Sequence, residues 1–454
     1  MCVYVCLQCS ECFTQSFFLA DAGNRLFCPG PVQARFFITL TERSDAMKDR
    51  NRVREVIEAD SPYARGTDEY YMDRAIRLAR LGAGHVNPNP LVGAVIVKSG
   101  RIIGAGYHEE IGGLHAERNA LAACTEDPVG SDIYVTLEPC CHYGKQPPCT
   151  DALLAAGVRR VIIGSRDPNP LVSGKGVRIL RAQGVEVVTD FLRAECDRLN
   201  PVFFHYITRK QPYVTLKYAM TLDGKIASAA GESRWISSEA SREKVRRDRG
   251  LSMGILVGVG TVLADDPALT CRTPGAIDPV RVILDTRLRT PLTAQVMKTA
   301  AVLPAQGGLP EVSARDGMRY PRTVIATCEK DKNKLEPYRK AGALVLSLPP
   351  DEDGRVSVPA LLKKLGAMKM DSLYVEGGGN VHWSFLRERA ADKVQIYIGP
   401  LLLGGADARS PVEGAGFPSP PEALRLTDIR TERIGDDLFL EGYPRTGGSS
   451  CLQE

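Results

Sequence analysis

The stretch from His115 to Cys149 constrains this chain more than any other, because it carries metal-binding residue types at defined spacings. His115 opens the segment HAERNALAAC, and Cys140 and Cys149 frame a loop that reads CCHYGKQPPC from 140 to 149. A catalytic zinc site uses three protein ligands and leaves one position open for water, and one imidazole with two thiolates meets that requirement. We therefore predict His115, Cys140 and Cys149 as zinc ligands.

Glu117 lies two residues after His115, where zinc deaminases carry a carboxylate that moves protons without binding the metal. We predict that Glu117 is the general acid and base. Any one of these residues alone would more often be an inert core residue, since free cysteine is among the most buried residue types. The combination of His-x-Glu at a helix start, a strand over 133–139 and a second helix start at CTDALLAAG favours the deaminase hypothesis. The usual signature is Pro-Cys-x-x-Cys, whereas eight residues separate Cys140 from Cys149 here.

Length and composition predict a globular enzyme of two or three domains. The chain has 454 residues, of which 44% are hydrophobic and 25% charged, and a net charge of +4. A charge this small over this length predicts no surface dedicated to nucleic acid. No apolar run reaches the roughly 18 residues of a membrane span, and the N-terminus lacks a signal-peptide pattern, so we predict a cytoplasmic location and no membrane association. The 13 cysteines are dispersed, which favours free thiols over disulfides.

Residues 1–66 are predicted to be an N-terminal extension, either disordered or produced by a start codon assigned too far upstream. Cysteines at 2, 6, 9 and 12 leave a second metal site or a partial iron–sulfur pattern as the alternative, but Ser16 stands where the next cysteine ligand is expected. Met47 and Met72 are internal alternatives for the start. The charged stretch MKDRNRVREVIEAD is compatible with a short surface helix, and SPYARG with a linker.

Two successive α/β patterns follow. The first begins with a helix capped at Thr67 or Asp68 and continues with strands at LVGAVIV, RIIGAGY, IYVTLEP, RRVIIGS and VEVV, separated by helical segments. The second begins at YVTLKYAMTLDGKIA and continues with strands at MGILVGVG, VRVILD, RTVIATC, ALVLSL, DSLYVEGGG and KVQIYIGP. Alternation of this kind predicts helices on both faces of a sheet. We expect domains at 67–207 and 212–445, a linker at 208–211 and a tail at 446–454.

With both halves in view, the chain resembles the bifunctional deaminase–reductase family of riboflavin biosynthesis. The motifs that carry the resemblance are NPNPLVGAVIV, HAERNAL, TLEPCCHYGKQPPC, DPNP, MTLDGKIA, SRWISS, GTVLADDPALT and VEGGG, which span about 68–443. The resemblance implies a cytidine-deaminase-like α/β/α sandwich followed by a dihydrofolate-reductase-like α/β domain. It implies zinc in the first domain and NADPH in the second. It also implies that a pyrimidinone ribosylamine phosphate is first deaminated and that its ribosyl group is then reduced to ribityl.

In the first domain the resemblance places Asn89, His108, His142 and Lys145 around the substrate. An amide such as that of Asn89 can read a pyrimidine edge, although without the resemblance Asn89 would be a plain turn residue between two prolines. Cys141 stands where the family commonly has serine. Adjacent residues of an extended segment point opposite ways, so Cys140 remains the predicted ligand.

The second domain has no G-x-G-x-x-G, so a Rossmann site is not predicted, and the glycines of VEGGGNVHWS are the best candidate phosphate cradle. The resemblance places these residues on the NADPH side: Ala219, Trp235, Thr261, Asp265, Thr286, Gly378, Gly379, Asn380, Val381, His382, Trp383 and Ser384. It places these around the reductase substrate: Ser233, Arg249, Leu269, Arg272 and Glu376. Lys217 and Asp223 are candidates for proton delivery.

Two alternatives stay open. One is a deaminase of free cytosine nucleotides or of a tRNA base, joined to an unrelated second domain; the long cysteine loop and the SRWISS and GTVLADDPALT segments speak against it. The other is a zinc-stabilised binding module, which a fourth protein ligand would indicate because structural zinc sites are closed. For the enzyme we expect a small-molecule partner and a homo-oligomer.

Overall fold

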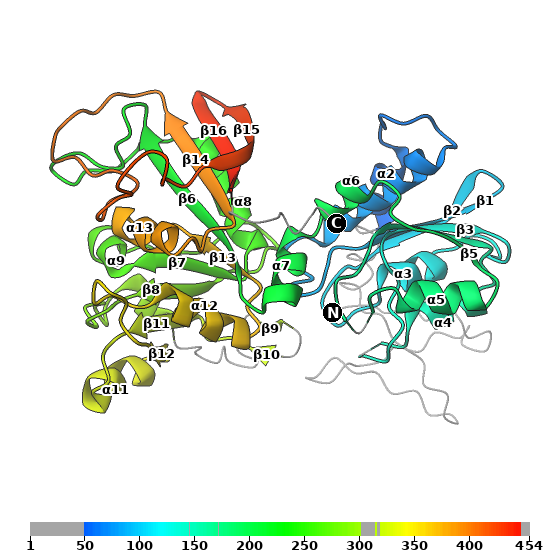
Figure 1. Cartoon of the computed structure of the whole chain (residues 1–454), viewed down its shortest axis with the longest axis horizontal. Helices are drawn as coiled ribbons and strands as arrows, with labels where there is room; N and C mark the ends of the chain where they lie inside the picture. The colour runs from blue at the N-terminus through cyan, green and yellow to red at the C-terminus, as the bar shows by residue number, and fades with distance from the viewer. Residues whose placement is uncertain (1–49, 145, 171, 301–313, 316–317, 446–454) are drawn as a thin grey trace, which may run out of the picture. The chain divides into compact units, whose positions relative to one another are not determined.

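The computed structural model describes residues 50–144, 146–170, 172–300, 314–315 and 318–445. Two separate sheets organise these residues, one of five strands and one of nine, and a small two-stranded pairing lies apart from both. Figure 1 labels the elements. The prediction of two α/β domains in succession is confirmed by this topology and by the family matches given below.

The five-stranded sheet of the first domain has the order β2-β1-β3-β4-β5. Pairing is antiparallel between β2, β1 and β3, and parallel between β3, β4 and β5. The parallel strands therefore end at one edge, where the loop after β3 carries Cys140. The strands are β1 (Gly93–Lys98), β2 (Arg101–Tyr107), β3 (Asp132–Leu137), β4 (Arg160–Ser165) and β5 (Glu186–Val188).

Helices cover both faces of this sheet, because alternate strand residues point to opposite sides. Ile96, Ile133 and Val161 face one way and form a core with α3, α4 and α5. Val97 and Tyr134 face the other way and pack with α2 and α6. The helices are α2 (Asp68–Ala79), η1 (Arg80–Gly82), α3 (Ala116–Ala122), α4 (Cys149–Ala155), α5 (Lys175–Ala182), α6 (Arg193–Asp197) and α7 (Pro201–Arg209).

Residues 53–66 are a folded part of this domain, which corrects the prediction of disorder for that piece of the extension. Residues 50–58 are helical, and α2 begins at the cap that the sequence predicts, with Thr67 accepting from the Tyr70 N–H. The side chain of Arg74 on α2 is fully buried. Its guanidinium donates to the carbonyl of Val56 in the last turn of the helix, and to those of Ala59 and Asp60 just after the helix.

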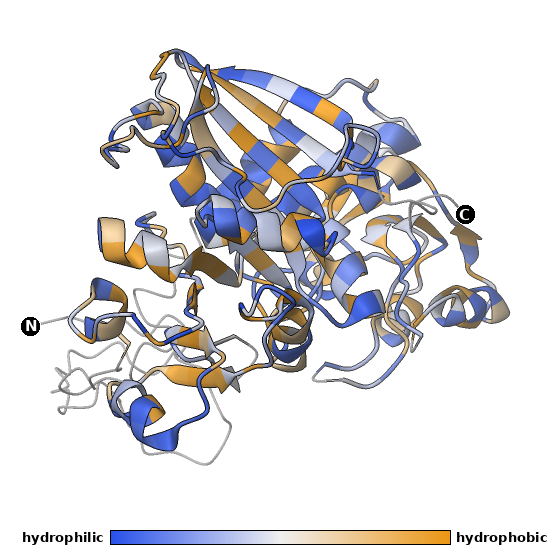
Figure 2. Ribbon diagram, turned by 60° about the vertical axis from the view of Figure 1, so that its left-hand side comes forward, coloured by the Kyte–Doolittle hydropathy of each residue, from blue (hydrophilic) through white to orange (hydrophobic). Residues whose placement is uncertain are grey.

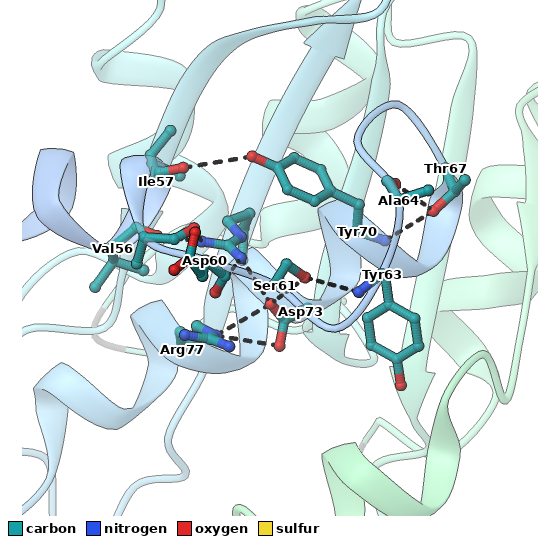
Figure 3. A network of polar contacts seen from close by, with 12 residues as sticks. Val56, Ile57, Asp60, Ser61, Tyr63, Ala64, Thr67, Tyr70, Asp73 and Arg77 are labelled. Carbon is teal, nitrogen blue, oxygen red and sulfur yellow. Dashed lines mark hydrogen bonds and ion pairs between the residues drawn. The ribbon is translucent and has the colours of Figure 1, made fainter.

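Val56 lies in the last turn of the helix, where carbonyls have no partner within the helix, so the charged donor satisfies its carbonyl and complements the helix dipole. The neighbouring Asp73 carboxylate accepts from Arg74 and also from Ser61 and Arg77 (Figure 3). The cysteines at 2, 6, 9 and 12, and with them the alternative of a second metal site, lie outside the described residues.

The nine-stranded sheet of the second domain has the order β12-β11-β8-β7-β13-β6-β14-β16-β15. The strands from β12 to β14 run parallel to their neighbours, and β16 and β15 are antiparallel additions at one edge. They are β6 (Tyr213–Thr221), β7 (Gly254–Gly258), β8 (Val280–Leu284), β11 (Thr323–Thr327), β12 (Leu344–Ser347), β13 (Ser372–Val375), β14 (Lys393–Gly399), β15 (Leu426–Ile434) and β16 (Asp437–Pro444); β9 (Ala314–Arg315) and β10 (Met318–Arg319) pair separately.

Helices cover both faces of this sheet as well. Leu216, Val282 and Val375 belong to a core with α12 and α13, whereas Val257 and Ile283 pack with α9, α10 and α11. Figure 2 shows hydrophobic and hydrophilic segments along the strands. The helices are α8 (Glu239–Leu251), α9 (Val259–Asp265), α10 (Gln295–Lys298), α11 (Lys332–Lys340), α12 (Val358–Ala367) and α13 (Gly379–Arg387). Among the described helices, none is both long and apolar enough to cross a membrane.

Two details differ from the sequence-based expectations. The predicted linker at 208–211 begins inside α7, which ends at Arg209 and is capped by Lys210 in a left-handed conformation. The β15–β16 hairpin was not predicted. Its two-residue turn, Gly435-Asp436, is a recognised hairpin signal, but β15 is mostly exposed and so lacks the apolar alternation that marks a strand.

Candidate active sites

The first candidate site is formed by His115, Cys140 and Cys149, whose ligand atoms all lie within 4.8 Å of one another. His115 Nδ1 lies 3.5 Å from the sulfur of Cys140 and 3.3 Å from that of Cys149. This is the only such group of His, Cys, Asp and Glu found in the parts of the chain that the structure describes. The structure thus brings together all three predicted ligands.

Local structure explains why the three residues meet. His115 is the N-cap of α3, and Cys149 is the first residue of α4, so both ligands stand at helix starts. The backbone N–H of Cys149 donates to the sulfur of Cys140 at 3.3 Å. Arg118 on α3 donates to the carbonyl of Pro148, which is the N-cap of α4, and so ties the two helix starts together. No local sequence pattern indicates this role of Arg118.

The donor set fits zinc. A hydrogen bond from the Cys149 thiol, together with the contact to His115, lowers the pKa of Cys140 against the opposing effect of burial, and the same bond raises the pKa of Cys149. The lowered pKa of Cys140 favours its thiolate, which is the form that binds metal ions. Cys141 is not part of the group, so no fourth protein ligand closes the site among the described residues. A three-ligand set with an open position is typical of catalytic rather than structural zinc.

Glu117 lies beside the ligands as the second residue of α3, and its side chain is buried. Burial raises the pKa of Glu117, and the neighbouring Cys140 adds to that rise. The neighbouring His115 and Cys149 oppose part of that rise. A buried carboxyl with a raised pKa next to a metal-ligand set is suited to accept and donate a proton.

His108 packs beside the predicted ligand His115, and Asn89 is hydrogen-bonded to His108. The His108 ring packs edge-on against His115, with centroids 5.4 Å apart. Its Nδ1 donates to the carbonyl of Leu114 at 3.0 Å, which leaves Nε2 to accept from the Asn89 amide at 3.2 Å. Burial lowers the pKa of His108 and so favours the neutral ring. His142 has a buried Nδ1 without a hydrogen-bond partner in the described part of the chain, while Lys145 lies outside it.

Two buried carboxylates near this site were not singled out from the sequence. Glu138 lies two residues before Cys140 and accepts from the N–H groups of Gly174 and Val177, so it caps the start of α5. Asp167, from the DPNP motif, accepts from the Asn169 N–H. Burial raises the pKa of Asp167 to about 6 against that hydrogen bond. The capping role of Glu138 depends on a long-range contact that no local pattern reveals.

The second candidate site is centred on Glu376, which follows β13. Arg249 from the end of α8 binds both carboxylate oxygens of Glu376, at 2.6 and 2.9 Å. Lys217 on the adjacent strand β6 lies 3.7 Å from the same carboxylate. Burial of Glu376 is outweighed by these two cations, which lower its pKa to about 2. Burial lowers the pKa of Lys217 despite the partial compensation from Glu376.

The glycine loop directly follows Glu376 in the chain, and α13 begins at its last residue, Gly379. Gly378 is the N-cap of α13 and Gly258 is the N-cap of α9, and neither helix has a side-chain cap hydrogen bond among the described residues. The two helix starts lie close together, since a Cβ atom on Gly258 would be 2.8 Å from the side chain of Val381. Uncapped N–H groups at a glycine-lined helix start suit a phosphate group, so this loop fits a nucleotide cofactor.

The structure sharpens the predicted cofactor segment. His382, Trp383 and Ser384 are buried, and His382 donates from Nδ1 to the carbonyl of Pro411. Any contact between a cofactor and this segment would therefore come from its first residues, of which Gly378 and Gly379 offer backbone groups.

The other predicted residues lie around the same edge of the sheet or in loops beside it. Trp235 is exposed and lies under the guanidinium of Arg242 at 4.1 Å. On the predicted cofactor side, Ala219 is in β6, Thr261 and exposed Asp265 are in α9, and Thr286 follows β8. On the predicted substrate side, Ser233 is half-buried, Leu269 is buried and Arg272 is exposed.

Asp223 is placed poorly for proton delivery. Its exposed carboxylate accepts from the Thr221 hydroxyl and from the N–H groups of Leu403 and Gly404. These hydrogen bonds, that of Thr221 first, lower the pKa of Asp223 to about 2. A carboxylic acid of this strength holds no proton near neutral pH, so the geometry favours Lys217 over Asp223.

The fold and the two sites define a class: a cytidine-deaminase-like domain with a zinc-type ligand set, followed by an α/β reductase domain. Two family models match accordingly. Residues 65–165 match the cytidine and deoxycytidylate deaminase zinc-binding region, and residues 212–440 match the RibD C-terminal domain.

Complete relatives show the same combination. The chain is 49% identical over 375 residues to riboflavin biosynthesis protein RibD of Actinobacillus pleuropneumoniae, covering 83% of this chain and 95% of the relative. It resembles a solved structure of Acinetobacter baumannii RibD with 35% identity and a TM-score of 0.72, covering 84% and 99% of the two chains. A deaminase/reductase structure from Thermotoga maritima matches with 36% identity and a TM-score of 0.68, covering 83% and 98%. The chain belongs to the RibD family of riboflavin biosynthesis, as its motifs predict.

Proposed function

We propose that this chain catalyses two consecutive steps of riboflavin biosynthesis on a diaminopyrimidinone ribosylamine phosphate: hydrolytic deamination of the ring, then NADPH-dependent reduction of the ribosyl group. The Thermotoga maritima relative is described as a diaminohydroxyphosphoribosylaminopyrimidine deaminase and 5-amino-6-(5-phosphoribosylamino)uracil reductase. The observation that carries the proposal is the meeting of His115, Cys140 and Cys149 beside buried Glu117.

In the first step, His115, Cys140 and Cys149 would hold a zinc ion, which lowers the pKa of a water molecule and so supplies a nucleophile at neutral pH. Glu117 accepts a proton as the water oxygen bonds to the ring carbon, and passes it to the nitrogen that leaves as ammonia. Asn89 is joined to the ligand set through His108, which packs against His115, and the hydrogen bond to His108 fixes its amide, which supports a role in binding the polar edge of the ring.

In the second step, bound NADPH would supply the hydride for the ribosyl carbon, and opening of the sugar ring to a ribityl chain requires a proton for the ring oxygen. Lys217 is the proposed donor of that proton, since burial lowers its pKa and Glu376 holds its Nζ in place. Arg249 is pinned by Glu376 and the carbonyl of Thr270, and exposed Arg272 is free to approach the phosphate of the substrate. The free N–H groups at the start of α13 support a cofactor phosphate there.

The proposed deaminase domain covers 67–207 with the folded segment 53–66 added, and the proposed reductase domain covers 212–445. A homo-oligomer is proposed because Leu222, Leu402 and Leu403 expose apolar side chains in neighbouring loops, and such patches mark interfaces. Light scattering after size exclusion tests this, and a monomer would contradict it. The free thiols of the described cysteines support a reducing compartment such as the cytoplasm.

A paired assay on purified full-length protein tests the proposal. The diaminopyrimidinone ribosylamine phosphate is added first, and ammonia is measured without NADPH; NADPH is then added and its oxidation followed by absorbance. Ammonia release followed by NADPH oxidation is the expected result. Ammonia without NADPH oxidation would contradict the reductase, and no ammonia from zinc-loaded protein would contradict the deaminase.

A further inference from the structure

The loop after β8 carries two arginines that neither proposed reaction uses. Arg287 and Arg289 are exposed, and no ion pair or side-chain hydrogen bond joins either one to another residue within the described ranges. Most arginines on α8, by contrast, are paired with acidic residues of the same helix or with Glu376. Two unpaired guanidinium groups in one short loop offer a site for an anion.

Hydrogen bonds with Asp285 and Tyr338 hold the backbone of this loop in place. Buried Asp285 accepts from both the N–H and the hydroxyl of Thr290, each at 2.7 Å. The hydroxyl of Tyr338 on α11 lies 3.0 Å from the carbonyl of Leu288 and 2.9 Å from that of Thr290. The backbone that carries the two arginines is therefore ordered before any ligand arrives, which lowers the entropic cost of binding.

The order of the strands places this loop relative to the proposed cofactor. Lys217 on β6 and Glu376 after β13 mark where the nicotinamide end of the cofactor is proposed to lie. The starts of α13 and α9, which lack a side-chain cap hydrogen bond, follow β13 and β7. The next parallel strand in the same direction is β8. From β6 to β8 is three strand spacings, about 14 Å, which an extended dinucleotide spans with its nicotinamide at one end and its adenosine at the other. The loop after β8 therefore lies at the adenosine end.

We propose that Arg287 and Arg289 bind the 2′-phosphate of the cofactor and so determine the preference for NADPH over NADH. The inference rests on the proposed NADPH-dependent reduction and adds the residues that select the cofactor. Guanidinium groups suit a terminal phosphate because they bind two of its oxygens at once. NADH lacks that phosphate, so the two guanidinium groups add nothing to its binding affinity.

The test uses full-length protein and two probes that need no reaction: 2′,5′-ADP and 5′-ADP, with dissociation constants from calorimetry. Wild type should bind 2′,5′-ADP more tightly, and the Arg287→Ala/Arg289→Ala variant should lose at least about tenfold of that preference, since charge-assisted hydrogen bonds are the strong ones. Affinity for 5′-ADP should stay within about twofold. The Arg287→Lys/Arg289→Lys variant should fall between the two, because the charge remains but the bidentate geometry is lost.

Arg433→Ala removes an exposed arginine from β15, at the far edge of the sheet, and is the matched control. It should retain the full preference. If the alanine double variant keeps the preference of wild type, or if Arg433→Ala loses as much, the assignment of these two arginines is wrong while the NADPH proposal stands. If wild type binds both probes equally, the NADPH proposal fails, and the inference fails with it.

Discussion

The two candidate sites treat a buried carboxyl group in opposite ways. At the first site, Glu117 and Asp167 are buried and have no ion-pair partner in the described part of the chain, and burial raises the pKa of each. At the second, Glu376 is half-buried, with its side chain 10% exposed, but Arg249 and Lys217 lower its pKa to about 2. Carboxyl groups of the first kind can exchange protons near neutral pH, whereas one of the second kind stays ionised and holds cations in place.

The difference matches the two proposed reactions. Deamination moves protons between water and nitrogen, so it needs a carboxyl whose affinity for a proton is raised. Reduction takes its hydride from a cofactor, so the protein chiefly orients two phosphate-bearing molecules, for which fixed arginines are suited. The same amino-acid type therefore serves as a proton carrier in one domain and as an anchor in the other.

The largest expected effect comes from Glu117→Gln, which keeps the shape of the side chain but removes its ability to carry a proton. Deamination should fall by about 10²- to 10⁴-fold. Zinc content, measured by elemental analysis, should stay at one per chain, and reduction of chemically supplied deaminated substrate should be unchanged. Loss of zinc from this variant would contradict the role assigned to Glu117.

Glu376→Gln tests the anchor at the second site. It leaves Arg249 and Lys217 buried without a counter-charge, and breaking a buried ion pair costs about 3–5 kcal/mol. Reductase activity should fall by about 100-fold or more, with a higher KM for substrate, while ammonia release stays the same. An equal loss of both activities would indicate one shared site and would contradict the assignment of the two activities to separate sites.

Arg74→Met asks whether the folded segment at 53–66 stabilises the first domain. The apolar replacement leaves the carbonyls of Val56, Ala59 and Asp60 without their donor, at a cost of about 1–3 kcal/mol for each group left unsatisfied. The thermal midpoint of the first domain should drop by several degrees, as followed by calorimetry. Arg54→Met, which removes an exposed arginine of the same segment, is the control and should change little.

Asp167→Asn gives the smallest expected effect and depends on pH. The folded pKa of Asp167, about 6, lies above its ordinary value of 3.8. The ionised carboxylate therefore costs stability above pH 6, by up to about 3 kcal/mol, and the cost fades as the pH falls from 6 toward 3.8. The variant should be more stable than wild type in urea at pH 7.5, and the gain should shrink at pH 5. A gain independent of pH would show that the pKa of Asp167 is not raised in the folded protein.

The sequence predicted the first site more completely than the second. Its three ligands fall within 35 consecutive residues, and two of them stand at helix starts that local patterns reveal. The second site joins Lys217 to Glu376 across adjacent strands that are far apart in the chain. The resemblance supplied the names of those residues, but no pattern indicated that Lys217 and Arg249 share one carboxylate.

By itself, then, the sequence determined the alternation of strands and helices, the zinc-type ligand set and the family, because periodicity and motif spacing are local properties of the chain. The tertiary structure decided which buried carboxyl groups face a cation, that Arg74 holds residues 53–66 in place, and which loops lie at the cofactor edge of the nine-stranded sheet. These features depend on strand order and on burial, which bring distant residues together and set their electrostatic surroundings.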